Sequence, residues 1–150
     1  MFRGQYQHAI DGKGRTSLPA RFREVLSTLT DSRLIVTTGL DDCLVAYPME
    51  SWVAFEQALK SKPSFNAGVK AIRRIYFSAA TECDIDKLGR VLLPSNLRTH
   101  AALDGEVLWC GSGEFMELWN PGDFAALRSQ LLETPESRAA IENELAELGL

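Results

Sequence analysis

The side chains of this chain best suited to catalysis or ligand binding form two aspartate–arginine pairs: Asp11 with Arg15, and Asp86 with Arg90. Two carboxylates could serve general acid–base catalysis, but aspartate is common at turns, and no nucleophile accompanies either one. An arginine guanidinium is a planar fork that can grip a guanine edge or a phosphate with two hydrogen bonds. The pairs therefore favour recognition of a polyanion, in which each aspartate braces its turn or orients its arginine.

Other motifs that could bind ligands or catalyse reactions are incomplete. Gly12-x-Gly14 lacks the Gly-Lys-Ser/Thr of a phosphate-binding loop, and Ser112 lacks the Gly-x-Ser-x-Gly spacing of a nucleophile elbow. His8 and His100 are isolated, and the cysteines lack the paired C-x-x-C spacing of a zinc site. We therefore expect no enzyme, no catalytic or metal site, no cofactor and no small-molecule substrate.

The composition is that of an ordinary folded domain with an uneven distribution of charge. The chain has 150 residues, of which 45% are hydrophobic and 24% charged, and its net charge is −4. This suits one domain, or two half-size repeats that share a core. Residues 1–33 hold six basic and three acidic groups, whereas residues 121–150 hold two basic and six acidic groups. A basic face can attract a polyanion, while an acidic tail discourages non-specific binding.

The sequence indicates a cytoplasmic protein. No apolar run approaches the ~20 residues that a membrane span needs, and polar residues interrupt the first ten positions, where a signal peptide would be apolar. The cysteines are odd in number and far apart, so a disulfide scaffold is not expected. Cys43 and Cys110 are expected to be buried as small hydrophobic residues.

An internal repeat organises the chain. Residues 11–23 match residues 86–98 at six of 13 positions, and the match resumes after a short gap, where residues 34–39 correspond to 107–111. We interpret this pattern as a tandem duplication. The expected organisation is a first repeat at 5–52, a helical connector at 53–80, a second repeat at 81–124 and an acidic helical tail at 125–150.

Each repeat predicts short strands around one helical turn. Gly14 and Gly89 supply the positive φ of a tight turn between two strands, and Pro19 and Pro94 open the helical turn. The expected strands are 5–10, 15–18, 34–36 and 44–47, then 80–85, 90–93, 107–109 and 115–119. Apolar spacing predicts further helices at 49–60, 66–76 and 135–148. The last of these is marginal in water by itself, so it frays or docks on a partner subunit.

The two copies of Asp-x-x-Gly-Arg-x-x-x-Pro-x-x-x-Arg resemble the DNA-binding half-domain of the AbrB/SpoVT superfamily. Two such copies in one chain that opens with Met-Phe-Arg-Gly resemble the MraZ family in particular, and this resemblance covers essentially the whole chain. It implies a mainly β fold with short helices: a swapped-hairpin, AbrB-like barrel formed by two tandem repeats about a pseudo-two-fold axis, with a helical insert and a C-terminal helix.

The resemblance also implies a function. MraZ proteins are sequence-specific transcriptional regulators that bind short, G-rich direct repeats in double-stranded DNA. These repeats lie upstream of the division and cell-wall gene cluster that begins with the regulator's own gene. The proteins assemble into homo-oligomeric rings and are found with the nucleoid. We therefore expect a DNA-binding, nucleoid-associated regulator that represses its own gene cluster.

The resemblance carries over residue by residue to the two turns. The residues expected to contact DNA are Arg15, Lys13, Arg90, Arg3, Arg21 and Lys87, of which Lys13, Arg3 and Arg21 more plausibly meet phosphates. The residues expected to shape the turns are Asp11, Gly14, Asp86 and Gly89. In the second copy Leu88 replaces Lys13 and Asn96 replaces Arg21. We therefore expect the first repeat to be the main DNA contact, with the second acting mostly as a scaffold.

Several alternatives stay open at this stage. The acidic tail and negative net charge also suit a ring-forming protein-interaction module without specific DNA binding. Related swapped-hairpin proteins serve as antitoxins, although a double repeat in one chain weighs against that function. Arg15 and Arg90 could simply cap their own turns, and Arg23 and Arg98 are expected to pair with an acid at the repeat interface. The tryptophans are expected in the core, not stacked on bases: Trp52, Trp109 and Trp119.

Overall fold

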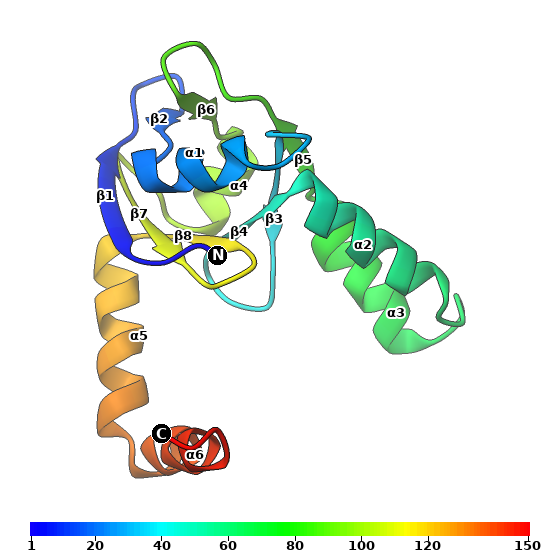
Figure 1. The fold of residues 1–150 in the computed structure, drawn as a ribbon, viewed down its shortest axis with the longest axis vertical. Coiled ribbons are helices and arrows are strands. Elements are labelled where there is room, and N and C mark those ends of the chain that lie inside the picture. Colours follow the sequence, from blue (N-terminus) through cyan, green and yellow to red (C-terminus); the bar gives the residue numbers. More distant parts are fainter. The chain divides into compact units, whose positions relative to one another are not determined.

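The same order of strands and helices occurs twice along the chain (Figure 1). In the computed structural model, which describes residues 1–150, the first half contains β1 (Gln5–Ala9), β2 (Arg15–Ser17), α1 (Ala20–Ser27), β3 (Leu34–Thr38), β4 (Leu44–Pro48) and α2 (Met49–Lys60). The second half contains β5 (Thr81–Cys83), β6 (Arg90–Leu92), α4 (Ser95–His100), β7 (Glu106–Gly111), β8 (Met116–Trp119) and α5 (Pro121–Glu133). The eight predicted strands are thus confirmed, each within a few residues of its predicted bounds.

The two halves exchange their first strands. β1 pairs antiparallel with β7 of the second half, with Gln5 opposite Cys110. In the same way β5 pairs with β3 of the first half, with Leu34 opposite Cys83. β4 and β8 join the two sides, so the six-stranded sheet has the order β1-β7-β8-β4-β3-β5. Neither half therefore completes a sheet from its own strands.

The expected closed barrel is not confirmed. The sheet ends at β1 and β5, which do not pair with each other. β2 and β6 instead form a separate two-stranded antiparallel ribbon, joined to β1 by a bridge between Ile10 and Thr16. Because these short strands pair with each other, they do not close the larger sheet.

The core is built from equivalent residues of the two halves. Leu18 and Leu93 follow the two ribbon strands, and Phe22 and Leu97 lie on the helices after them; all four are fully buried. The ring of Phe22 also packs edge-on against Phe2, with centroids 5.5 Å apart. This shared core explains why the two halves form one compact unit, Met1–Asn120.

The tryptophans and cysteines are buried, as predicted. Trp52, Trp109 and Trp119 are at most 4% exposed. Their rings therefore pack inside the protein and are not available to stack on bases. The three cysteines are free thiols in buried positions: Cys43, Cys83 and Cys110.

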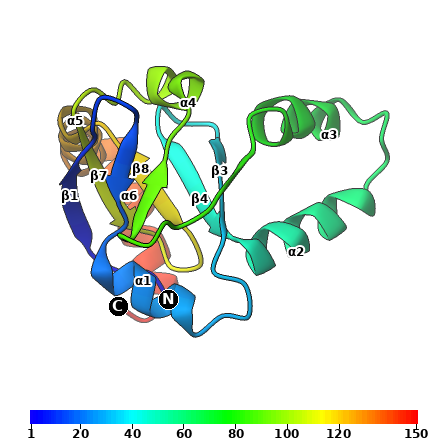
Figure 2. The same cartoon turned by 90° about the horizontal axis from the view of Figure 1, so that it is seen from above.

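Helices α2 and α3 (Ala67–Ile72) project from one side of the sheet (Figures 1 and 2). The bounds of α2 equal those predicted. Asn66 caps α3, because its Oδ1 accepts hydrogen bonds from the backbone N–H groups of Gly68 and Val69 at 2.8 and 3.2 Å. The predicted helix at 66–76 is confirmed in extent, but its last turn, η1 (Arg73–Phe77), is a π-helix.

The last 30 residues form a second compact unit, Pro121–Leu150. It holds α5 and α6 (Pro135–Glu147), the latter close to the predicted tail helix. The helical tail expected at 125–150 includes most of α5, but the apolar spacing does not mark α5 as a separate helix, because its apolar residues are not concentrated on one face and none of them is buried. None of the helices of this protein is both long and apolar enough to cross a membrane.

Candidate nucleic-acid interface

The turn between β1 and β2 is organised by Asp11. Its Oδ1 accepts hydrogen bonds from the backbone N–H groups of Lys13 and Arg15, both at 2.9 Å. Its Oδ2 accepts a hydrogen bond from Arg15 Nε at 2.7 Å. The Asp11 carbonyl also accepts the N–H of Gly14, whose φ is +94°. One carboxylate thus fixes both the turn and the direction of the arginine.

The turn between β5 and β6 repeats this arrangement. Asp86 Oδ1 accepts the backbone N–H groups of Leu88 and Arg90 at 2.9 and 2.8 Å, and its Oδ2 accepts Arg90 Nε at 3.0 Å. In both turns the terminal guanidinium nitrogens make no hydrogen bond within the protein. Each arginine therefore keeps two donors, Nη1 and Nη2, for an external acceptor.

Pairing of β2 with β6 brings the two arginines onto one surface. Thr16 lies opposite Val91 in the ribbon, and both side chains are 1% exposed, so they face the core. Because side chains alternate along a strand, Arg15 and Arg90 point to the opposite, outer face. Arg15 lies opposite Leu92, so the two arginines are diagonal neighbours, with Cβ atoms somewhat less than about 7–8 Å apart.

Two further residues lie on this outer face, beyond those that the motif in the sequence indicates. Ser17 lies opposite Arg90, and Leu92, which is 55% exposed, lies opposite Arg15. The alternation of inward and outward residues along each ribbon strand could have indicated both. The outer face of the ribbon therefore consists of Arg15, Ser17, Arg90 and Leu92.

Each half of the chain also closes the turn of the other half. The guanidinium of Arg98 lies against Gly14, and that of Arg23 lies against Gly89. Arg98 Nε donates to the carbonyl of Leu93 at 3.0 Å. The prediction that Arg98 pairs with an acid is therefore wrong, because a backbone carbonyl accepts its Nε–H. The expected position at the repeat interface is confirmed for both arginines.

Two lysines lie on the turns themselves. Lys13 and Lys87 are both exposed, and each adds a positive charge next to an arginine. Leu88, which takes the place of Lys13 in the second turn, is 70% exposed. The surface therefore combines six cations (Lys13, Arg15, Arg23, Lys87, Arg90 and Arg98) with the two bracing carboxylates.

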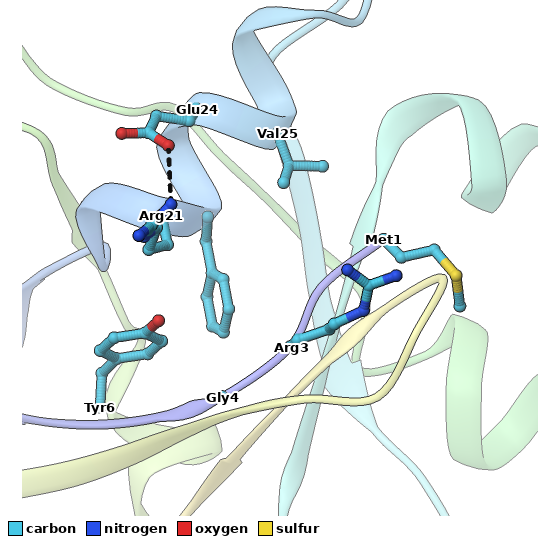
Figure 3. A pocket seen from close by; sticks show the side chains of 8 residues that line it. Met1, Arg3, Gly4, Tyr6, Arg21, Glu24 and Val25 are labelled. Atoms are coloured by element: carbon cyan, nitrogen blue, oxygen red, sulfur yellow. Dashed lines mark ion pairs between the residues drawn. The ribbon is translucent and has the colours of Figure 1, made fainter.

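Arg3 and Arg21 lie apart from the turns. They line a cavity of about 420 Å³ together with Tyr6 (Figure 3). Arg21 Nη1 is 3.9 Å from Glu24 Oε2, a weak surface ion pair. Arg3 and Asp11 lie on opposite sides of β1, and no residue of the ribbon or of its turns lines this cavity. The structure therefore does not bring these two arginines to the ribbon.

The bracing contacts stabilise the charged form of both aspartates. The backbone N–H of Arg15, followed by its guanidinium and the N–H of Lys13, lowers the pKa of Asp11 to about 2, against a smaller opposing effect of partial burial. The backbone N–H of Arg90 likewise lowers the pKa of Asp86. A low pKa is the opposite of what a general base near neutral pH requires.

The arrangement of side chains gives little support for metal binding or for a nucleophilic serine or cysteine. No group of three or more His, Cys, Asp or Glu residues is placed to hold a metal ion. Ser112 lies in the β7–β8 hairpin, where its N–H donates to the carbonyl of Phe115 at 2.9 Å. Burial raises the pKa of Cys83 to about 11 and that of Cys110 to about 12. These thiols are therefore poor nucleophiles.

Comparison with known protein families matches both halves of the chain to the same family. The family described as "MraZ protein, putative antitoxin-like" matches residues 1–75 and again residues 76–145. The chain belongs to the MraZ family. It therefore carries two tandem copies of the family's domain, which agrees with the duplicated order of strands and helices.

Several curated relatives are similar over most of the chain. The "Transcriptional regulator MraZ" of Desulforamulus reducens is 48% identical over 130 residues, which cover 87% of this chain and 89% of that protein. The protein of the same name from Moorella thermoacetica is 48% identical over 120 residues, or 80% of this chain and 81% of that protein. That of Desulfitobacterium hafniense strain DCB-2 is 41% identical over all of both chains.

Proposed function

We propose that this protein is a sequence-specific transcriptional regulator that binds double-stranded DNA through the outer face of the β2–β6 ribbon. One observation carries the proposal: Arg15 and Arg90 stand on the same exposed face, each braced by an aspartate and each with two free donor groups. Membership of the MraZ family, and the name transcriptional regulator given to its relatives, support the same function.

The dimensions of the ribbon suit the major groove of DNA. This groove is about 12 Å wide and admits a two-stranded β-ribbon, whose strands are about 4.8 Å apart. In the proposed complex Arg15 and Arg90 each donate two hydrogen bonds to O6 and N7 of a guanine, or to a phosphate. Leu92, on the same face, contacts thymine methyl groups.

The aspartates prepare the arginines for this contact. Because Asp11 and Asp86 hold Nε, the guanidinium planes are oriented before DNA arrives. Less side-chain freedom is then lost on binding. The same geometry supports contact by both turns, and so a larger share for the second repeat than the sequence alone suggests.

The remaining cations are proposed to contact the DNA backbone. Lys13 and Lys87 lie on the turns and are placed to meet phosphates on either side of the groove, which fix the register without reading sequence. Arg3 and Arg21 lie beyond the ribbon. We propose for them only phosphate contacts with DNA outside the groove that the ribbon occupies.

The finer parts of the proposal concern assembly and target. We propose that residues 5–52 and 81–124 are the two DNA-contacting repeats, in which the exchanged strands are a swapped hairpin. Copies assemble into a ring that binds direct repeats upstream of the protein's own gene, within the nucleoid, and represses the gene cluster. With a net charge of −4, one copy binds DNA weakly. Several linked copies raise avidity by about 10²–10⁴ when the spacing of sites permits.

The test is a comparison of two DNA duplexes by fluorescence anisotropy at several salt concentrations. One duplex comes from the region upstream of the gene, and the other is a scrambled sequence. We expect tight binding to the first alone, with log K falling by about 0.9 per phosphate contact for each tenfold rise in salt. Equal, weak binding to both would favour a protein-interaction module instead.

Arginine variants then test the site itself. Arg15→Ala or Arg90→Ala should weaken specific binding by about 1–3 kcal/mol, or roughly 5- to 150-fold. The melting temperature should barely change, because exposed ion pairs contribute little to stability. Arg138→Ala is the matched control: its Nε lies 3.0 Å from Glu142, the same distance as in the Arg90–Asp86 pair, but on α6. If Arg15→Ala unfolds the protein, Arg15 is a structural residue.

A further inference from the structure

The cavity that Arg3 and Arg21 line has the size of a small-molecule site. It lies between residues 1–6 and α1 (Figure 3), and its lining residues come from these two segments alone. Its volume is about 420 Å³. Known small-molecule sites occupy about 300–1,000 Å³. All of its walls belong to the compact unit Met1–Asn120, so the cavity is formed within one folded unit.

Three hydrogen-bond donors of this cavity lack a strong partner in the protein. The Arg3 guanidinium and the Tyr6 hydroxyl make no hydrogen bond and no ion pair, and Arg21 has only its 3.9 Å contact with Glu24. Figure 3 shows the hydroxyl of Tyr6 pointing toward Arg21, and Arg3 turned toward Val25. These donors are therefore available to an external acceptor, and guanidinium groups favour the oxygens of carboxylates and phosphates.

The floor of the cavity is apolar and firmly held. Phe22 is 1% exposed, and Val25 packs against the same core. The ring of Tyr6 packs edge-on against Phe22, with centroids 5.3 Å apart. Gly4 leaves the space open, because a Cβ there would lie 3.0 Å from the Tyr6 hydroxyl and its φ of +97° disfavours any side chain. Unpaired cations above an apolar floor suit a ligand with an oxyanion and an apolar body.

The charges of the walls favour phosphate over carboxylate. The cavity holds two guanidinium groups against one carboxylate, that of Glu24. The Glu24 side chain is 70% exposed and is not hydrogen-bonded to Arg21, so it can turn into solvent when an anion takes its place. A phosphate monoester carries close to two negative charges and three acceptor oxygens near neutral pH. It can therefore engage both arginines, whereas a carboxylate offers one charge and two oxygens.

We propose that this cavity binds a small organic phosphate, as a ligand and not as a substrate. The phosphate group accepts hydrogen bonds from Arg21 and the Tyr6 hydroxyl, and Arg3 supplies the second positive charge. The apolar body of the ligand covers Phe22 and Val25. A phosphate of the DNA backbone offers the same anionic group without this body, so the apolar contact distinguishes the two sources. The proposal does not rest on the function proposed for the ribbon.

Calorimetric titration of the full chain without DNA tests the cavity. The probe is phenyl phosphate, which joins a phosphate group to an apolar ring, and its two parts are titrated separately as inorganic phosphate and phenol. We expect phenyl phosphate to bind at least about fivefold more tightly than inorganic phosphate, because its ring leaves water for the apolar floor. Phenol alone should bind more weakly than phenyl phosphate, because it lacks the anion.

Four variants assign the binding to the lining residues. Arg21→Ala should weaken phenyl phosphate binding about tenfold, through the loss of a charged hydrogen bond. Val25→Thr should weaken the binding of phenyl phosphate but not that of inorganic phosphate. Glu24→Gln removes the competing carboxylate and should tighten both by about two- to fivefold. Arg74→Ala, at an exposed position of η1 outside the cavity, is the matched control and should change neither.

Three results would overturn the proposal. These are no binding of phenyl phosphate, an affinity no higher than that of inorganic phosphate, and an affinity that Arg21→Ala leaves unchanged. Arginines that meet only DNA phosphates would give the first result, while Arg21→Ala would still weaken binding of the scrambled duplex. Circular dichroism verifies the fold of each variant. Anisotropy with the upstream duplex tests the proposed function separately, so either proposal can fail without the other.

Discussion

The guanidinium of Arg98, in the second half of the chain, lies against Gly14 in the first half, where a Cβ on the glycine would be 2.8 Å from Arg98 Nε. The converse contact joins Arg23 to Gly89. The ribbon adds two reciprocal hydrogen bonds, from the N–H of Leu18 to the Gly89 carbonyl and from the N–H of Leu93 to the Gly14 carbonyl, both 2.9 Å. Each turn is therefore braced by its own aspartate and is also packed and hydrogen-bonded by residues of the other half.

Replacing Gly14 by alanine should destabilise the protein. The φ of +94° costs an alanine about 1–2 kcal/mol. Its Cβ would also lie 2.7 Å from the Leu93 carbonyl oxygen, which as backbone cannot easily move. We expect a loss of at least about 2 kcal/mol in the free energy of unfolding, measured by chemical denaturation.

Two further glycine variants serve as controls for this prediction. Gly12→Ala meets no atom within 4 Å, so it should change stability by less than about 0.5 kcal/mol. Gly89→Ala should cost only the conformational strain, about 1–2 kcal/mol, because the flexible end of Arg23 can move aside. Equal losses for Gly12→Ala and Gly14→Ala would contradict the packing described here.

The sequence predicts the local structure well, for physical reasons. Pro19 and Pro94, together with Gly14 and Gly89, restrict the backbone so strongly that the turns and helix starts follow from residue type. The strands β3, β4, β7 and β8 are likewise visible as short apolar runs between turns, whereas the more polar β1, β2, β5 and β6 follow from the repeated turns beside them. The Asp–Arg motif indicated that arginine and aspartate act together, and the structure adds that they are bonded through Nε.

The strand pairings and side-chain contacts between the two halves could not be predicted from the sequence in the same way. Nothing in one sequence states that β1 pairs with β7, or that Arg98 crosses to Gly14, because both depend on how the halves pack. The same limit explains why Arg98 was expected to find an acid, when a carbonyl was nearer. The bounds of helix α5 within the expected helical tail were not predicted, because its apolar residues do not form a buried stripe.

The Asp11 brace should make stability depend on pH in the acid range. Because folding lowers the pKa of Asp11 from 3.8 to about 2, the charged carboxylate stabilises the fold. This contribution is complete above pH 3.8 and is lost as the pH falls towards 2. Asp11→Asn should therefore be less stable than wild type near neutral pH, and the difference should shrink on acidification.

Carbon-detected NMR titration would test the brace directly. The Asp11 carboxyl should titrate well below 3.8 in the wild type, and Arg15→Ala should move its pKa back towards that value. Arg33→Ala is a control, since Arg33 braces Asp31 and not Asp11. An Asp11 pKa that does not respond to Arg15→Ala would refute the bracing role.

The cysteines should be unreactive in the folded protein. All three are buried, and burial raises the pKa of Cys43, Cys83 and Cys110, so little thiolate exists at mildly alkaline pH. A thiol-specific chromogenic disulfide should label none of them rapidly in buffer, and all three in denaturant. Rapid labelling of one thiol in buffer would show that its segment opens readily.

The second turn should accept an added phosphate contact. Leu88 occupies the position of Lys13 and is 70% exposed, so Leu88→Lys introduces a cation beside Arg90 without disturbing the core. We expect tighter binding to the upstream duplex, with the slope of log K against log salt steeper by about 0.9 per copy bound. Leu40→Lys, at a position 82% exposed in the β3–β4 hairpin, is the matched control and should change neither quantity much. If both variants bind alike, the ribbon is not the DNA-contacting surface; if only Leu88→Lys gains affinity, the second repeat takes part in binding.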